Sequence, residues 1–179
     1  LWKSDGTAEG TRLVKDIQPG PGSSKPWRLV DVNGTVFFVA DDGINGSALW
    51  KTDGTNGGTT MVKEIISGNV GGFQQASQYA YYGIPFNVLW QNGGHFYFVA
   101  NNYATVPSGG GYTNNIELWK SDGTLTGTAL VKDIRPGTFS SGPEFVTPVG
   151  DRVYFSASDG VSGEELWVSD GSMTGTMLV

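Results

Sequence analysis

Few side chains in this 179-residue sequence are well suited to catalysis or metal binding, because it has one histidine and no cysteine. A zinc site of His and Cys ligands, a disulfide and a cysteine nucleophile are therefore excluded. A Ser-His-Asp triad would need His95, but the sequence has no Gly-x-Ser-x-Gly elbow for the serine. At the matching places of two other repeat units stand Thr35 and Arg152, so we interpret His95 as a surface residue of a strand.

Paired carboxylates could act as acid and base in glycoside hydrolysis. Glu117, Glu164 and Glu165 each precede a Leu-Trp pair, where we interpret them as solvated turn ends. A sialidase-like site would gather arginines, but these occupy unrelated repeat positions, at Arg12, Arg28, Arg135 and Arg152. A phosphate-binding glycine loop is also absent. We therefore predict no catalytic residue and no enzyme activity in this chain.

Composition narrows the classes of partner. The formal net charge of −6 disfavours binding to nucleic acid, because a protein that binds it needs a basic face. The same charge disfavours adhesion to anionic membranes by charge alone. The sequence holds no run of 18 apolar residues, so we predict no membrane insertion as a helix. The 28 glycines lack a Gly-X-Y period and indicate many tight turns.

A tandem repeat must position all of these side chains. Four segments align without gaps, and they begin at Leu1, Leu49, Leu118 and Leu166 with spacings of 48, 69 and 48 residues. The first reads LWKSDGTAEGTRLVKDI and the third LWKSDGTLTGTALVKDI. The middle unit carries 21 extra residues in two insertions, which fall between strand-like segments where loops tolerate added length.

Each unit reads as four short strands. The first is Arg28–Val32, with copies at 87–91 and 144–149, and an Asn33-Gly34 turn of the hairpin type joins it to the second at Val36–Ala40. The third strand holds the Leu-Trp pair, and the fourth is Thr11–Ile17 with its copies. Four strands every 48 residues predict an all-β fold, a β-propeller of four-stranded blades, rather than a sandwich, barrel or solenoid.

The chain then forms a single repeat domain over 1–179, about three and a half blades. We predict a half blade at 1–25, a blade at 26–72, a blade with two insertions at 73–142 and a blade at 143–179. That gives 14 strands. We expect either a segment of a longer propeller, completed by remaining blades or a protein partner, or a homodimer that completes a seven-bladed ring in trans. The start at Leu1 and the stop at Val179 inside a motif favour the first.

The repeated residues have a structural interpretation. We expect the four tryptophans to pack between neighbouring sheets, and the Asp-Gly pairs to form turns in which Asp accepts hydrogen bonds from backbone amides. We predict no metal and no cofactor; an alternative makes these carboxylates calcium ligands, although the turns lack the oxygen spacing of an EF-hand loop. The positions are Trp2, Asp5, Gly6, Trp50, Asp53, Gly54, Trp119, Asp122, Gly123, Trp167, Asp170 and Gly171.

The middle unit has aromatic residues that the other units lack. They either bind a ligand or partner, such as a glycan, or fold back over their own blade. The candidate binding residues are Tyr79, Tyr81, Tyr82, Trp90, Tyr103 and Tyr112.

The register ELWxSDGTxxGTxLVKDI, followed by a PG…SS…P…VNG…VYF stretch, resembles the tandem ELWxxDGT repeats of large secreted or surface-exposed bacterial proteins, some of them called hyalin-like. Its Asp-Gly turn resembles the Asp-box hairpin of sialidase-like propellers, with a different spacing. The resemblance covers nearly the whole chain and implies an extracellular or cell-surface propeller module, with no defined activity.

Three functions follow from these patterns. The main expectation is a non-catalytic extracellular propeller scaffold that serves surface structure, adhesion or protein assembly. The first alternative is a carbohydrate-binding module that uses the inserted aromatic residues. The second alternative is part of a larger propeller enzyme whose active site lies outside this chain.

Overall fold

The computed structural model describes residues 1–65, 90–92, 94–101 and 115–179. Within these residues all regular structure is β-strand, and the strands pair only in the antiparallel sense. The prediction of an all-β chain of four-stranded units is confirmed. The sheets do not close into a ring, so their arrangement as a propeller stays a prediction.

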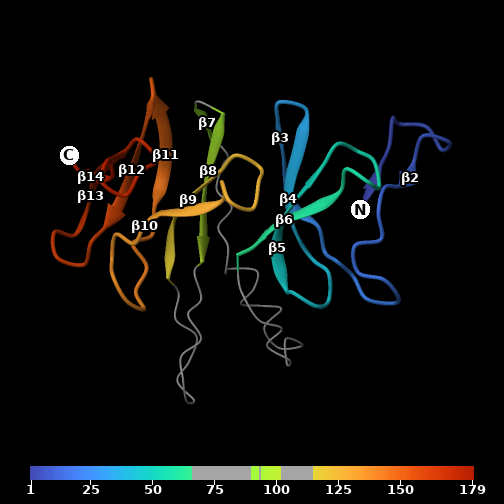
Figure 1. Cartoon of the computed structure of the whole chain (residues 1–179), viewed down its shortest axis with the longest axis horizontal. Coiled ribbons are helices and arrows are strands. Elements are labelled where there is room, and N and C mark those ends of the chain that lie inside the picture. The colour runs from blue at the N-terminus through green and yellow to red at the C-terminus, as the bar shows by residue number, and fades with distance from the viewer. Residues whose placement is uncertain (66–89, 93, 102–114) are drawn as a thin grey trace, which may run out of the picture. The chain divides into compact units, whose positions relative to one another are not determined.

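The chain divides into two compact units, Leu1–Gly71 and Gly72–Val179. The first unit contains a two-stranded sheet of β1 (Trp2–Lys3) and β2 (Arg12–Leu13). It also contains a four-stranded sheet in the order β3 (Trp27–Val32), β4 (Thr35–Asp41), β5 (Ser47–Thr52) and β6 (Thr60–Glu64). Figure 1 shows these strands from blue to green.

The second unit contains two four-stranded sheets (Figure 1). One runs β7 (Trp90–Asn92), β8 (His95–Asn101), β9 (Ile116–Ser121) and β10 (Ala129–Lys132). The other runs β11 (Glu144–Val149), β12 (Arg152–Ser158), β13 (Glu164–Ser169) and β14 (Met177–Leu178). Each sheet is a meander, so neighbours in sequence are neighbours in space. Whether both units belong to one repeat domain over 1–179 stays a prediction.

The hairpin between β3 and β4 shows why the sequence fixes the register. Val32 pairs with Thr35, and the two residues between them, Asn33 and Gly34, both have positive φ, at 53° and 81°. This is the backbone of a type I′ turn, whose twist matches the twist of the strands that it joins. The predicted Asn-Gly turn is therefore present.

Among the described residues of each unit, apolar faces of successive sheets meet in a core. In the first unit Ile17 and Leu1 pack with four residues of the β3–β6 sheet, namely Phe38, Ala40, Ala48 and Trp50. In the second unit Ile134, Val131 and Leu118 pack with Val153, Phe155, Ala157 and Trp167 of the β11–β14 sheet. Because Ile17 and Ile134 hold the same repeat position, the two cores are two copies of one sheet-to-sheet contact.

Candidate functional site

The four repeat tryptophans do not share one environment. Trp50, Trp119 and Trp167 are buried, and each lies opposite a phenylalanine of the neighbouring strand. Trp2 is 67% exposed, which corrects the expectation that all four pack between sheets. The physical reason is that β1 and β2 form a sheet of two strands only, so the phenylalanine-bearing strand that would flank Trp2 is missing from its sheet.

The Asp-Gly turns use their carboxylates locally. In the third turn Asp122 Oδ1 accepts hydrogen bonds from the Thr124 amide at 2.8 Å and from Thr124 Oγ1 at 2.6 Å. Thr124 Oγ1 in turn accepts from the amide of Gly127 at 2.9 Å. The hydroxyl bond, followed by the amide bond, holds the pKa of the Asp122 carboxyl below its usual value.

The same turn explains the second glycine of the motif. A Cβ added at Gly127 would lie 2.0 Å from Asp122 Cγ, far inside van der Waals contact. Gly10, Gly58 and Gly175 meet their own aspartates in the same way. Each aspartate is therefore committed to closing a turn, in agreement with the structural interpretation.

Lysines join one sheet to the next at equivalent places. Lys15 Nζ donates to the carbonyl oxygen of Thr59 at 2.8 Å, and Lys132 Nζ donates to that of Thr176 at 2.7 Å. The Lys132 ammonium also lies 5.8 Å from the centre of the Trp167 ring, within range of a cation–π contact. These lysines belong to the Lys-Asp pairs, which the sequence repeats at the end of the predicted fourth strand.

Among the described residues, the strongly perturbed carboxyl is that of Glu117 at the start of β9, which is fully buried. Its Oε2 accepts from Ser141 Oγ at 2.5 Å and from the amide of Ile134 at 3.3 Å. Its Oε1 accepts from the amide of Ser141 at 2.9 Å. Ser140 Oγ and the amide of Gly142 both donate to the carbonyl of the preceding residue, Ile116. Residues Ser140–Gly142, which we call the Ser-Ser segment, therefore close over the beginning of β9.

Burial is the main influence on the Glu117 carboxyl, and it raises the pKa to about 7. The hydrogen bonds from Ser141 and Ile134 act in the opposite direction, because they stabilise the ionised form. The nearby Asp133 raises the pKa further, since two negative charges repel. A group this deeply covered cannot touch a dissolved substrate, so its place in the structure is that of a clasp between segments.

Sequence reasoning missed this clasp. We expected Glu117, Glu164 and Glu165 to be solvated turn ends, which fits the two exposed residues and is wrong for Glu117. The signal that could have identified it is the repetition of paired serines, at Ser23-Ser24 and at Ser140-Ser141. A buried carboxylate needs donors, and serine hydroxyls with their amides supply them.

One of the six candidate binding residues of the middle unit lies within the described residues. Tyr79, Tyr81, Tyr82, Tyr103 and Tyr112 lie outside the described residues. Trp90 begins β7 and pairs with Tyr97 through the backbone. Binding at these aromatic residues, to a glycan or a protein, stays a prediction.

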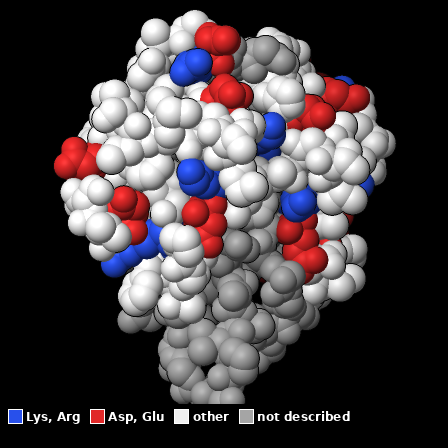
Figure 2. Space-filling model, turned by 60° about the vertical axis from the view of Figure 1, so that its left-hand side comes forward, with Lys and Arg blue, Asp and Glu red and all other residues white. Residues whose placement is uncertain are grey.

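The described residues hold no group of three or more His, Cys, Asp or Glu side chains that could bind a metal ion. None of them belongs to a helix long and apolar enough to cross a membrane. Figure 2 shows Lys and Arg interspersed with Asp and Glu over the visible face, with no large area of one sign.

Comparison with known proteins gives a similarity to a solved structure. No family model matches the sequence, and no curated protein matches it. The chain is similar to the solved structure of a novel α-L-arabinofuranosidase from Clostridium thermocellum, with 21% identity and a TM-score of 0.31. The similarity covers 88% of this chain and 50% of the other, so the chain spans about half the length of that enzyme. At this TM-score the similarity carries no argument about activity.

The comparison gives no support to our main functional expectation. The similar protein is a glycoside hydrolase, whereas we expected a non-catalytic extracellular scaffold, and we do not carry that function forward. Membership of the ELWxxDGT-repeat proteins stays a prediction.

Proposed function

We propose that this chain supplies blades to a larger β-propeller enzyme whose active site lies outside the chain. The observation that carries the proposal is the sheet-to-sheet contact that occurs once in each unit. Ile17 packs with Trp50 in the first unit, and Ile134 packs with Trp167 in the second. The bonds from Lys15 to Thr59 and from Lys132 to Thr176 accompany these contacts.

A contact that repeats with the sequence can be continued by adding further units. Trp50 is buried against the Lys-Asp-Ile end that contains Ile17, and Trp167 against the one that contains Ile134. Trp2 has the same sequence surroundings and remains 67% exposed. An indole ring of this size is most stable when covered, since burial of about 150–250 Å² is typical of large aromatic side chains. The uncovered Trp2 therefore supports a propeller with more blades than this chain provides.

The placement of the reacting groups outside the chain rests on how its carboxyls are used. Asp5, Asp53, Asp122 and Asp170 each accept two hydrogen bonds from the Thr or Ser two positions later in the turn. Glu117 is enclosed by the Ser-Ser segment. In the described part of the chain, the carboxyl with the strongly raised pKa, Glu117, is thus one that substrate cannot reach.

The test compares the chain with the native protein that contains it. An antibody raised against the chain isolates that protein from its source, and both are assayed on nitrophenyl glycosides, starting with the α-L-arabinofuranoside. We expect the native protein to be larger than the chain and to hydrolyse at least one substrate, while the chain alone hydrolyses none. Hydrolysis by the isolated chain would place the active site inside it. If the native protein is larger than the chain but inactive on every glycoside, the proposal that it is an enzyme of this kind is refuted.

Two further expectations continue as proposals beside this one. An extracellular location would be supported by recovery of the native protein from the culture medium or the cell surface. Completion of a ring by a second copy meets a difficulty, because each four-stranded sheet of the described residues already contains its own first and second strands. The two-stranded sheet β1–β2 lacks that pair of strands, and an identical copy lacks the same pair.

A further inference from the structure

Two Glu-Leu pairs occupy the same repeat position and have opposite environments. Glu117 and Leu118 are both 0% exposed at the start of β9. Glu165 and Leu166 begin β13 in the same way, yet Glu165 is exposed and Leu166 is 50% exposed. The same contrast holds for Val131 in β10, which is 3% exposed, and the matching Val179 directly after β14, which is 71% exposed.

What covers the first pair is known in detail. The Ser-Ser segment donates two hydrogen bonds to the Glu117 carboxyl, from the amide and the hydroxyl of Ser141. The carbonyl of Ser141 then accepts from the amide of Ser158, which ties the segment to the end of β12. Leu118 packs in one core with Phe155 and Trp167 of the β11–β14 sheet. Glu117 and Leu118 are therefore covered by a Ser-Ser segment together with the sheet that follows it.

The first unit contains a second copy of this covering element. Ser24 matches Ser141 in the repeat, and its carbonyl accepts from the amide of Asp41 at 3.0 Å, as that of Ser141 accepts from Ser158 at 2.9 Å. A proline follows two residues later in both copies, at Pro26 and Pro143. The Ser-Ser segment is thus part of the repeat, and in both copies the carbonyl of its second serine accepts from the end of the following second strand.

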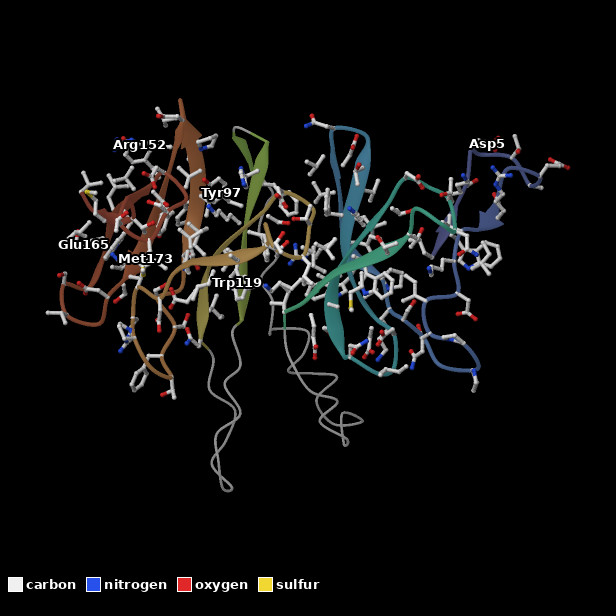
Figure 3. The ribbon with its side chains drawn as sticks, viewed as in Figure 1. Asp5, Tyr97, Trp119, Arg152, Glu165 and Met173 are labelled. Carbon is white, nitrogen blue, oxygen red and sulfur yellow. The ribbon has the colours of Figure 1, made fainter. Side chains whose placement is uncertain are left out.

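We propose that the exposed surface made of Glu165, Leu166, Met177 and Val179, called the Glu165 face, docks a further repeat unit of this sequence pattern. The Ser-Ser segment of that unit donates to the Glu165 carboxyl, and its Phe- and Trp-bearing strands cover Leu166. This inference rests on the proposed function and names the partner of one blade face. Figure 3 shows Glu165 on the side of the β11–β14 sheet that lies farther from Tyr97 and Trp119.

A second copy of this chain is a poorer occupant than a further unit. Docking requires a Ser-Ser segment followed by a sheet with an uncovered tryptophan. In the chain Trp50 and Trp167 are already buried. The exposed Trp2 belongs to a sheet of two strands with no Ser-Ser segment before it in this sequence. An identical copy therefore cannot present the segment and the free tryptophan together.

The test extends the chain in register. Val179 matches Val131, so the sequence of residues 132–179 is appended directly after Val179. Amide hydrogen exchange is measured for β13 and β14 in the extended and the unmodified chain. We expect exchange at Leu166 and Val168 to slow by at least about tenfold, since covering a sheet face raises the free energy of local opening. Tryptophan emission should also shift to shorter wavelength as the added indole is buried.

Matched variants isolate the role of the carboxyl. In the extended chain Glu165→Gln keeps the acceptor oxygen and loses the charge, and replacing the two appended serines by alanine removes the hydroxyls. Both should recover part of the fast exchange at Leu166. Glu164→Gln is the control, because Glu164 is also exposed but matches Ile116, whose side chain has no role in the clasp. Equal effects of Glu164→Gln and Glu165→Gln would contradict the proposal.

A second arm uses a synthetic peptide with the sequence of residues 133–179, which includes the Ser-Ser segment and the Phe- and Trp-bearing strands, added to the unmodified chain. We expect slower exchange at Leu166 that is lost in Glu165→Gln. Absence of protection in both arms would overturn the docking site. Dimerisation of the unmodified chain in sedimentation, abolished by Glu165→Gln, would assign the face to a second copy instead. None of these readouts involves glycoside hydrolysis, so the docking site and the enzyme proposal fail separately.

Discussion

Replacement of Glu117 by glutamine should change how the stability of this protein depends on pH. Burial raises the pKa of the folded-state carboxyl to about 7, from an ordinary value of 4.5. The folded protein therefore keeps a proton that the unfolded chain releases. The stabilisation from this group is complete below pH of about 4.5 and is lost as the pH rises through about 7.

The magnitude follows from the two pKa values. A shift of one pKa unit corresponds to about 1.4 kcal/mol, so linkage between about pH 5 and pH 8 gives a loss of about 2.5 kcal/mol in the free energy of unfolding. Glutamine accepts a hydrogen bond from Ser141 without titrating. The variant should lack this pH-dependent loss, while every other titrating group stays common to both proteins.

The assay is urea denaturation followed by tryptophan fluorescence at half-unit steps over that pH range, with the free energy extrapolated linearly. The informative quantity is the difference in free energy of unfolding between the Glu117→Gln variant and the parent at each pH. We expect that difference to change by about 2.5 kcal/mol in favour of the variant towards high pH. Glu165→Gln serves as the control, because Glu165 is exposed and should give a nearly flat difference. A flat difference for Glu117→Gln as well would refute the reasoning.

Two more substitutions test the packing and the turns. Trp167→Ala should destabilise by about 3–5 kcal/mol because the ring is buried, whereas Trp2→Ala should change the free energy of unfolding by less than about 0.5 kcal/mol. Similar losses at both positions, measured by urea denaturation, would show that Trp2 is covered. Gly127→Ala should destabilise through the clash with Asp122, and Gly57→Ala, which meets open space, is its control. In an Asp122→Ala background Gly127→Ala should cost less, and a double-mutant cycle with no coupling would argue against the clash.

The strands were predictable because their determinants are local. The predicted second strand Val36–Ala40 lies within β4, and the predicted turn at Asn33-Gly34 has the expected positive φ values. Alternation of side chains along a strand and the glycine at a turn depend on residues a few positions apart. The role of the Asp-Gly pairs was predictable for the same reason, since each aspartate bonds within its own turn.

The clasp at Glu117 was not predictable from local pattern. Its main partner, Ser141, lies 24 residues further along the chain and reaches it only after β10 and the following segment have folded back. Glu165 has nearly identical neighbours in the sequence and is exposed. Sequence neighbours therefore could not distinguish a buried carboxyl from a solvated one.

By itself, the sequence determined the repeat, the four-strand unit and the turn chemistry, because hydrogen bonding within a hairpin and side-chain alternation are set over short distances. Only the tertiary structure decided which copies of each repeated residue are covered. Burial depends on whether another sheet lies against the residue, as it does for Trp167 and Glu117 and does not for Trp2 and Glu165. Similar sequences thus acquire unequal environments, and the uncovered Glu165 lies on the surface where we propose that a further repeat unit docks.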